Sequence, residues 1–229
     1  MAAPLRAVVF DFYGTLTAGR SGDAQRRARV EQAGALGVDV DAFDAELTAT
    51  VHERFAGAGG DVAGSLRWIA ARIGARPTDA QVAEAARVRL AAERVFGEPR
   101  PEAVGVLRAV HERGLRVGLI SDCSAELPAY FADLPIAPYV DAPVFSFVTG
   151  ERKPDPANYL ACCAQLGVEP AECLYVGDGG SNELAGARAV GMRPVHLAVT
   201  AEAGGVVYGR HLDWDGETIT SLEQVLDLL

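Results

Sequence analysis

The sequence predicts an α/β fold, a doubly wound parallel sheet with a bundle of helices inserted after its first strand. From residue 101 to the C-terminus, apolar runs alternate with amphipathic stretches, as strands and crossover helices do in such a sheet. Another apolar run, LRAVVFDF, stands near the N-terminus. Between them, residues 20–97 have helical periodicity and no strand pattern.

The run LRAVVFDF is uninterrupted and ends at Asp11, which is typical of a central strand buried on both faces. Four helices are expected in the insert. The first spans about residues 26–36, and the others carry the apolar stripes Phe43, Leu47, Val51 and Phe55; Leu66, Ile69 and Ile73; and Val82, Ala86 and Leu90. Asp41 and Asp79 are the expected N-caps, and Gly37, Gly57 and Gly74 stand where helices would end.

The remaining elements alternate between strand and helix. Pro101 favours a helix start and Gly114 a helix end. The following elements are expected in this order: a helix over 101–113, the strands LRVGLIS and APVFSFV, a helix from Asp155-Pro156 to Gly167, the strand CLYVGD, a helix over 181–190, the strand RPVHLAV and the helix SLEQVLDLL.

Composition limits the possible partners. The 229 residues include 31 acidic and 21 basic side chains, a net charge of −10, and no basic stripe, which argues against nucleic acid. No apolar run reaches the roughly 18 residues of a membrane span, and no signal peptide is recognisable. The four cysteines form no CxxC pair, so we expect them to be reduced and the protein to be cytoplasmic. Oligomeric state cannot be predicted from this sequence.

Lysine occurs once, at Lys153, beside 20 arginines. A composition biased toward arginine could leave one lysine by chance. The functional interpretation is that this position needs a compact ammonium on a flexible stem, which a planar guanidinium cannot replace.

Polar residues follow the predicted strands where a binding site would lie. Ligands bind beyond the carboxyl ends of strands in open α/β sheets. Asp11, Ser121, the Lys153 loop and Asp178 all stand at such ends, so we expect them to converge. Two carboxylates would repel each other without a cation between them, and Mg²⁺ prefers such oxygen ligands. Ser121 and Lys153 would then hold a phosphate group opposite the metal.

The segments DFYGTLT, LISDCS, RKPDP and VGDGGSNEL, in this order, resemble the four motifs of the haloacid dehalogenase superfamily, in particular its helical-cap, phosphatase-like members. The resemblance implies a Rossmann-like catalytic core at residues 1–17 and 98–229 and a helical cap domain at 18–97. It also implies a magnesium-dependent phosphatase acting on a small phosphorylated metabolite.

The resemblance also assigns roles. Asp11 would attack phosphorus and form an aspartyl-phosphate, and Lys153 would screen Asp11 and steady the transferred charge. Thr15 would position the Asp11 carboxylate, and the implied substrate-binding residues are Thr15, Ser121, Asp122 and Lys153. The implied magnesium ligands are Asp11, the Tyr13 carbonyl, Asp178 and, in the outer acidic position, Glu183, with Asn182 a less favoured choice.

Structural roles remain alternatives for some of these residues. Ser121 and Asp122 are also common at turns and N-caps. Glu183 could simply favour the first turn of a helix through the helix dipole. Arg20 could reach a second anionic group of the substrate, or it could be a solvated linker residue.

Tyr13 departs from the phosphatase pattern, which has a second aspartate there as general acid and base. A phenol with a pKa near 10 is a poor acid at neutral pH, and losing such a group costs about 10²- to 10⁴-fold in rate. The pattern DxYGT also occurs in the superfamily's metal-independent 2-haloacid dehalogenases. Asp178 argues against that alternative, because a dehalogenase needs no metal carboxylate. A catalytically weak ligand-binding homologue is the third possibility.

Overall fold

The computed structural model describes residues 4–18, 22–198 and 214–229. Its centre is a six-stranded sheet in the order β3-β2-β1-β4-β5-β6, and all neighbouring strands are parallel. The strands are β1 Ala7–Phe10, β2 Arg116–Ser121, β3 Ala142–Phe145, β4 Cys173–Gly177, β5 Arg193–Leu197 and β6 Thr218–Ile219. The chain winds outward in one direction from β1 and in the other from β4, which confirms the predicted doubly wound fold.

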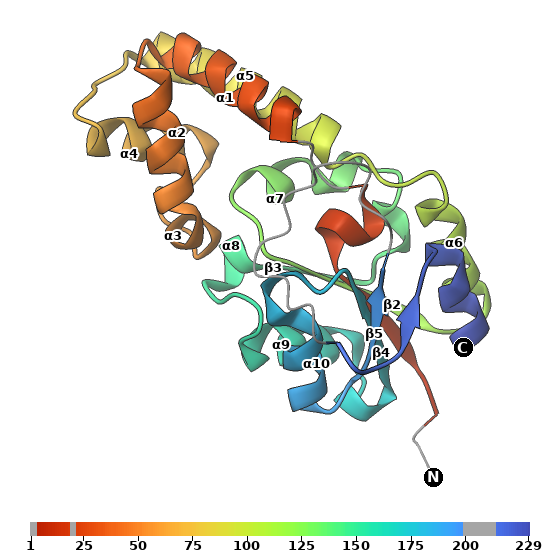
Figure 1. The fold of residues 1–229 in the computed structure, drawn as a ribbon. Helices are drawn as coiled ribbons and strands as arrows, with labels where there is room; N and C mark the ends of the chain where they lie inside the picture. Colours follow the sequence, from red (N-terminus) through yellow and green to blue (C-terminus); the bar gives the residue numbers. More distant parts are fainter. Residues whose placement is uncertain (1–3, 19–21, 199–213) are drawn as a thin grey trace.

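Helices cover both faces of this sheet (Figure 1). In β1, Val8 and Phe10 join an apolar cluster with α6 (Ala103–Glu112) and the C-terminal η6 (Leu222–Leu228). Ala7 and Val9 join a second cluster with α9 (Pro156–Leu166) and α10 (Glu183–Val190). The uninterrupted apolar run therefore reflects a strand buried on both faces, as expected.

The inserted segment forms its own helical layer beside the sheet (Figure 1). Its helices are α1 Gly22–Leu36, α2 Val40–Ala49, α3 Val51–Phe55, α4 Val62–Arg72 and α5 Asp79–Phe96. A third apolar cluster lies largely within this layer and contains Leu36, Phe43, Leu66 and Val82. The chain leaves and re-enters the core side by side, because Thr17 bridges Pro99. The limits of a separate cap domain at residues 18 and 97 stay a prediction.

Two predicted N-caps are wrong, because in each case an earlier residue caps the helix. Asp39 caps α2 by accepting from the backbone N–H of Ala42 at 2.9 Å, whereas Asp41 lies within the first turn. Thr78 caps α5 in a capping box with Gln81, and Asp79 is the first helical residue. A cap needs extended backbone with the side chain folded back onto the first turn, and sequence does not distinguish this from a first-turn acid.

Several element ends also differ from expectation. The second predicted helix divides at Thr50 into α2 and α3, so the insert has five helices among its described residues. The segment APVFSFV is a strand only to Phe145, and α8 (Ser146–Thr149) follows it. The Ser146 hydroxyl accepts from the Cys123 N–H and donates to the Cys123 carbonyl, which draws the chain toward the loop after β2.

The remaining elements are short or begin later than predicted. The helix expected from Pro101 begins at Ala103, the one expected from residue 181 begins at Glu183, and the C-terminal segment is a 3-10 helix. Helix α7 (Glu126–Tyr130) and β6 were not predicted. Short helical turns occupy Phe12–Leu16 (η1), Phe131–Asp133 (η2), Ala137–Tyr139 (η3), Pro170–Glu172 (η4) and Gly180–Asn182 (η5). None of the helices in the described ranges has the length and apolarity needed to cross a membrane.

Candidate active site

Asp11 is the first residue after β1, at the centre of the sheet. Its backbone N–H donates to the carbonyl of Val176 on β4 at 2.9 Å, and its side chain is buried. The chain then turns sharply through η1, where Gly14 has a φ of +87°. A Cβ at Gly14 would collide with the Asp178 carboxylate, so glycine lets these two loops approach each other.

Lys153 lies beside Asp11 with its ammonium almost fully buried. Its Nζ donates to Asp11 Oδ1 at 2.5 Å and to Glu183 Oε2 at 2.6 Å. Burial opposes the charged form, but the Asp11 and Glu183 carboxylates outweigh burial and raise the pKa of Lys153 above its usual value. The two carboxylates therefore favour the charged form of the only lysine of the chain.

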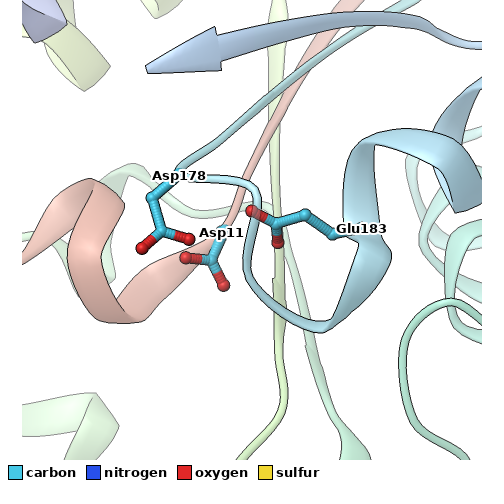
Figure 2. A group of neighbouring side chains, drawn as sticks. All are labelled: Asp11, Asp178 and Glu183. Carbon is cyan, nitrogen blue, oxygen red and sulfur yellow. The ribbon is translucent and has the colours of Figure 1, made fainter. Parts of the chain in front are cut away.

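Three carboxylates converge at the carboxyl ends of β1 and β4. Figure 2 shows Asp11, Asp178 and Glu183 pointing toward one another, and one oxygen from each lies within 4.8 Å of the others. Asp178 Oδ1 accepts from the Gly180 N–H at 2.9 Å, which fixes its orientation. Lys153 offsets part of the charge of this carboxylate cluster, but three acids face one ammonium.

The pKa values of the carboxylate cluster reflect this excess of negative charge. Burial and the neighbouring Asp178 raise the pKa of Asp11 to about 6, although Lys153 opposes the shift. Burial and the charge of Asp11 raise the pKa of Glu183 to about 8. A bound cation would remove much of this repulsion.

Glu183 is the most completely hydrogen-bonded member of the carboxylate cluster. Its Oε2 accepts from the Tyr175 hydroxyl at 2.8 Å as well as from Lys153, and its Oε1 accepts from the Gly179 N–H at 3.0 Å. Both oxygens are thus already bound by protein donors. This arrangement suits an outer position that supports Lys153 better than direct contact with an ion.

Four buried oxygens at this end of the sheet have no hydrogen-bond partner within the described ranges: Asp11 Oδ2, Thr15 Oγ1, Ser121 Oγ and Asp122 Oδ2. Ser121 ends β2, the neighbour of β1. Buried polar atoms are rarely left unpaired, so such a group of oxygens indicates a place for a polar ligand. The structure does not show the expected contact from Thr15 to the Asp11 carboxylate.

Asp122 lies next to Ser121, and its side chain is hydrogen-bonded to the backbone of the Lys153 loop. Its Oδ1 accepts from the Lys153 backbone N–H at 3.0 Å, while its Oδ2 is buried without a described partner. Asp122 therefore helps to hold Lys153 in place. Its predicted contact with substrate stays a prediction.

The residues present fit a hard divalent cation. Asp11 Oδ2 is a buried, unpaired carboxylate oxygen, and Asp178 supplies a second carboxylate within reach of it. Oxygen donors with net negative charge are the set that Mg²⁺ prefers. The backbone turn at Tyr13, the third predicted ligand, lies between Asp11 and Gly14 in the same loop.

Tyr13 extends toward the helical insert. Its hydroxyl donates to Glu93 Oε2 on α5 at 3.4 Å, and its ring packs edge-on against Phe12 with the ring centroids 4.8 Å apart. The residue two positions after Asp11 therefore joins the loop after β1 to the insert. Arg20, the other predicted contact near this loop, lies outside the described residues.

Sequence reasoning missed several residues that support the site. Arg100 donates from Nε to the Thr15 carbonyl at 2.9 Å and from Nη2 to the Gly14 carbonyl at 3.2 Å, which holds the turn after Asp11. Sequence reasoning assigns Tyr175 to a strand without a functional role. In the structure its hydroxyl donates to Glu183 and holds that side chain in place. No local pattern marks Arg100, because its partners lie 85 and 86 positions earlier in the sequence.

Comparison with known proteins gives relatives among phosphatases. Over 195 residues the chain is 26% identical to the glyceraldehyde 3-phosphate phosphatase of Methanopyrus kandleri, covering 84% of each protein. It is 27% identical over 216 residues to the phosphoglycolate phosphatase of Salmonella paratyphi A, covering 84% of this chain and 81% of that one.

Solved structures share the fold at lower identity. A 2-haloacid dehalogenase from Pseudomonas syringae pv. Tomato superposes with a TM-score of 0.72 at 22% identity, covering 98% of this chain and 97% of that one. A HAD phosphatase from Thermococcus onnurineus gives a TM-score of 0.65 at 18% identity, with the same coverage. The sequence model of the haloacid dehalogenase-like hydrolases matches residues 5–191. The chain belongs to this hydrolase family.

Proposed function

We propose that this protein is a Mg²⁺-dependent phosphatase that hydrolyses a small phosphorylated metabolite through an aspartyl-phosphate on Asp11. The observation that carries the proposal is the group of buried, unpaired oxygens of Asp11, Thr15 and Ser121 beside the Lys153 ammonium. A phosphoryl group, with its acceptor oxygens and negative charge, suits hydroxyl donors and an ammonium. The phosphatase names of the relatives also support it.

The proposed reaction begins with attack of an Asp11 oxygen on phosphorus, which breaks the bond from phosphorus to the leaving oxygen. Lys153 holds the carboxylate and steadies the charge of the transferred group, and Ser121 and Thr15 donate to its oxygens. Water then attacks the phosphorus of the aspartyl-phosphate and releases Asp11. Splitting a hard hydrolysis into two displacements is the usual benefit of a carboxylate nucleophile.

Asp11, the Tyr13 carbonyl and Asp178 would hold the Mg²⁺, with Glu183 in the outer acidic position. When bound, the ion would offset negative charge on the phosphoryl oxygens. The four cysteines of the chain are free and buried, in keeping with the expected cytoplasmic location. The acidic net charge of −10 argues against nucleic acid as a partner.

Metal-independent dehalogenation is the second candidate, and Tyr13 favours it. The same aspartate would then attack carbon and displace halide. Asp178 counts against this alternative, because its carboxylate lies close to Asp11 and adds repulsion that a bound cation would relieve.

Hydrolysis of p-nitrophenyl phosphate with Mg²⁺ and with EDTA, beside halide release from 2-chloropropionate, tests the proposal. We expect phosphate release that needs Mg²⁺ and no halide release. Asp178→Asn should lose the Mg²⁺ response. Halide release that persists in EDTA would contradict the phosphatase assignment and favour the dehalogenase.

A further inference from the structure

The side chain two positions after the nucleophile has its proton engaged elsewhere. The Tyr13 hydroxyl donates to Glu93 Oε2 at 3.4 Å. The backbone of Glu93 is held at this point, because the buried Tyr130 hydroxyl donates to its carbonyl at 3.0 Å. The Tyr13 hydroxyl therefore faces a carboxylate acceptor that competes with a leaving group for its proton.

The Lys153 ammonium beside Asp11 is engaged as well. The Lys153 ammonium has three hydrogens, and it contacts Asp11 Oδ1, Glu183 Oε2 and the Ile120 carbonyl, the last at 3.5 Å. It is buried between two carboxylates, so giving up a proton would leave both without their countercharge. Neither Tyr13 nor Lys153 is arranged to protonate a leaving oxygen.

We propose that the substrates of this enzyme are acyl phosphates, in which the phosphoryl group is joined to a carboxylate. The inference rests on the proposed phosphatase function. In the first step an Asp11 oxygen bonds to phosphorus, the bond from phosphorus to the acyl oxygen breaks, and the electron pair stays on the departing carboxylate. No proton moves in this step.

The second step of the proposed reaction also releases a carboxylate, so its leaving group needs no acid. Water bonds to phosphorus, the bond from phosphorus to Asp11 breaks, and Asp11 departs as a carboxylate while water gives a proton to solvent. In the second step the site releases the Asp11 carboxylate without a general acid. The same site can therefore release a substrate carboxylate in the first step without a general acid. An alkyl phosphate would instead have to release a strongly basic alkoxide, which slows the reaction by about 10²- to 10⁴-fold without a general acid.

The test is the dependence of kcat/KM on the leaving group, measured with acetyl phosphate, p-nitrophenyl phosphate, phenyl phosphate and glycerol 3-phosphate at saturating Mg²⁺. Asp11→Asn supplies the rate of spontaneous hydrolysis for subtraction. We expect kcat/KM to fall steeply in that order. In Tyr13→Asp, which adds a carboxyl group at this position, glycerol 3-phosphate should gain about 10²-fold or more while acetyl phosphate changes only a few-fold.

Glu93→Gln tests whether the insert supplies a hidden acid, with Glu98→Gln on the exposed segment after α5 as the matched control. The steep dependence should persist in both variants. A specific loss of glycerol 3-phosphate turnover in Glu93→Gln, or equal turnover of acetyl phosphate and glycerol 3-phosphate by the parent, would overturn the acyl phosphate proposal. Absence of Mg²⁺-dependent turnover on all four substrates would instead overturn the phosphatase function itself.

Discussion

At the scale of single residues, the site is governed by the charge around one lysine. The Lys153 ammonium lies between Asp11 and Glu183, and Asp178 adds a third carboxylate within 4.8 Å of those two carboxylates. Arginine could not replace it without displacing one carboxylate, because a guanidinium is broader and planar. The single lysine in a chain with 20 arginines therefore has a geometric explanation.

Asp11→Asn tests the nucleophile. Asparagine has nearly the same volume, and it removes a buried charge whose cost is shown by the raised pKa of Asp11, about 6. We expect turnover to fall by about 10⁴-fold or more with the fold intact. Rates with p-nitrophenyl phosphate and a thermal melt followed by circular dichroism check both parts, and parental activity in this variant would refute the assignment.

Stability should depend on pH and Mg²⁺ together. Burial raises the pKa of Asp11 from 3.8 to about 6 and that of Glu183 from 4.5 to about 8. Without metal, the native state thus binds more protons than the unfolded state between about pH 4 and pH 8, so the free energy of unfolding falls as pH rises through this window.

Mg²⁺ binds the ionised carboxylates, so the increase in Tm on adding Mg²⁺ should be larger at about pH 8 than at about pH 5. Thermal melts in Mg²⁺ and in EDTA at both pH values measure this difference. Asp178→Asn is the control and should remove the Mg²⁺ effect. An equal increase in Tm at both pH values would show that these carboxylates do not hold the ion.

At the scale of elements, the turns after β1 and β4 decide how closely the acids approach. Gly14 has a positive φ, and the absence of a side chain lets the Asp178 carboxylate lie against it. Arg100 holds the same turn from the segment that returns from the insert. The loop after β1 therefore depends on a residue that follows the whole helical layer in sequence.

Gly14→Ala should impair both stability and metal binding. We expect a loss of about 1–3 kcal/mol in the free energy of unfolding from strained backbone, together with weaker Mg²⁺ binding because the new Cβ displaces Asp178. Gly114→Ala is the matched control: its φ is +76°, and its Cβ would meet no atom within 4 Å. Denaturant unfolding and Mg²⁺ titration compare the two. Equal metal affinity in both variants would exclude the proposed collision.

At the scale of the whole molecule, α5 connects the helical insert to the segments that follow β1 and β2. Tyr13 of the loop after β1 contacts Glu93, and the buried Arg89 pairs with Glu126 at the start of α7. The Ser124 hydroxyl also donates to Glu126 at 2.5 Å, within the loop that follows Ser121. One helix of the insert thus contacts the segments that carry the predicted nucleophile and a predicted phosphate ligand.

Arg89→Met should destabilise the protein by about 3–5 kcal/mol, because it leaves Glu126 as a buried, unpaired charge. The matched control is Arg87→Met, which breaks an exposed pair with Glu84 on the same helix and should cost at most about 1 kcal/mol. The double variant Arg89→Met/Glu126→Leu should recover most of the loss. Urea unfolding measures all three, and equal losses in the two single variants would contradict the structural role of the buried pair.

Much of the fold was predictable because it follows from local patterns. The apolar run before Asp11 predicted a strand buried on both faces, and the alternation after residue 101 predicted the parallel sheet. Element ends were less predictable. Whether Asp39 or Asp41 caps α2 depends on backbone angles that both residues can adopt.

The sequence by itself determined the fold class, the order of the four motifs and the identity of the candidate nucleophile and lysine, because parallel strands bring their carboxyl ends to one edge wherever they stand in the chain. Only the tertiary structure decided that the Glu183 oxygens are already bound, that Arg100 holds the loop after β1 and that the Tyr13 hydroxyl faces Glu93. These contacts join residues 30, 86 and 80 positions apart. They depend on how loops and the helical insert pack against the sheet, which no local periodicity records.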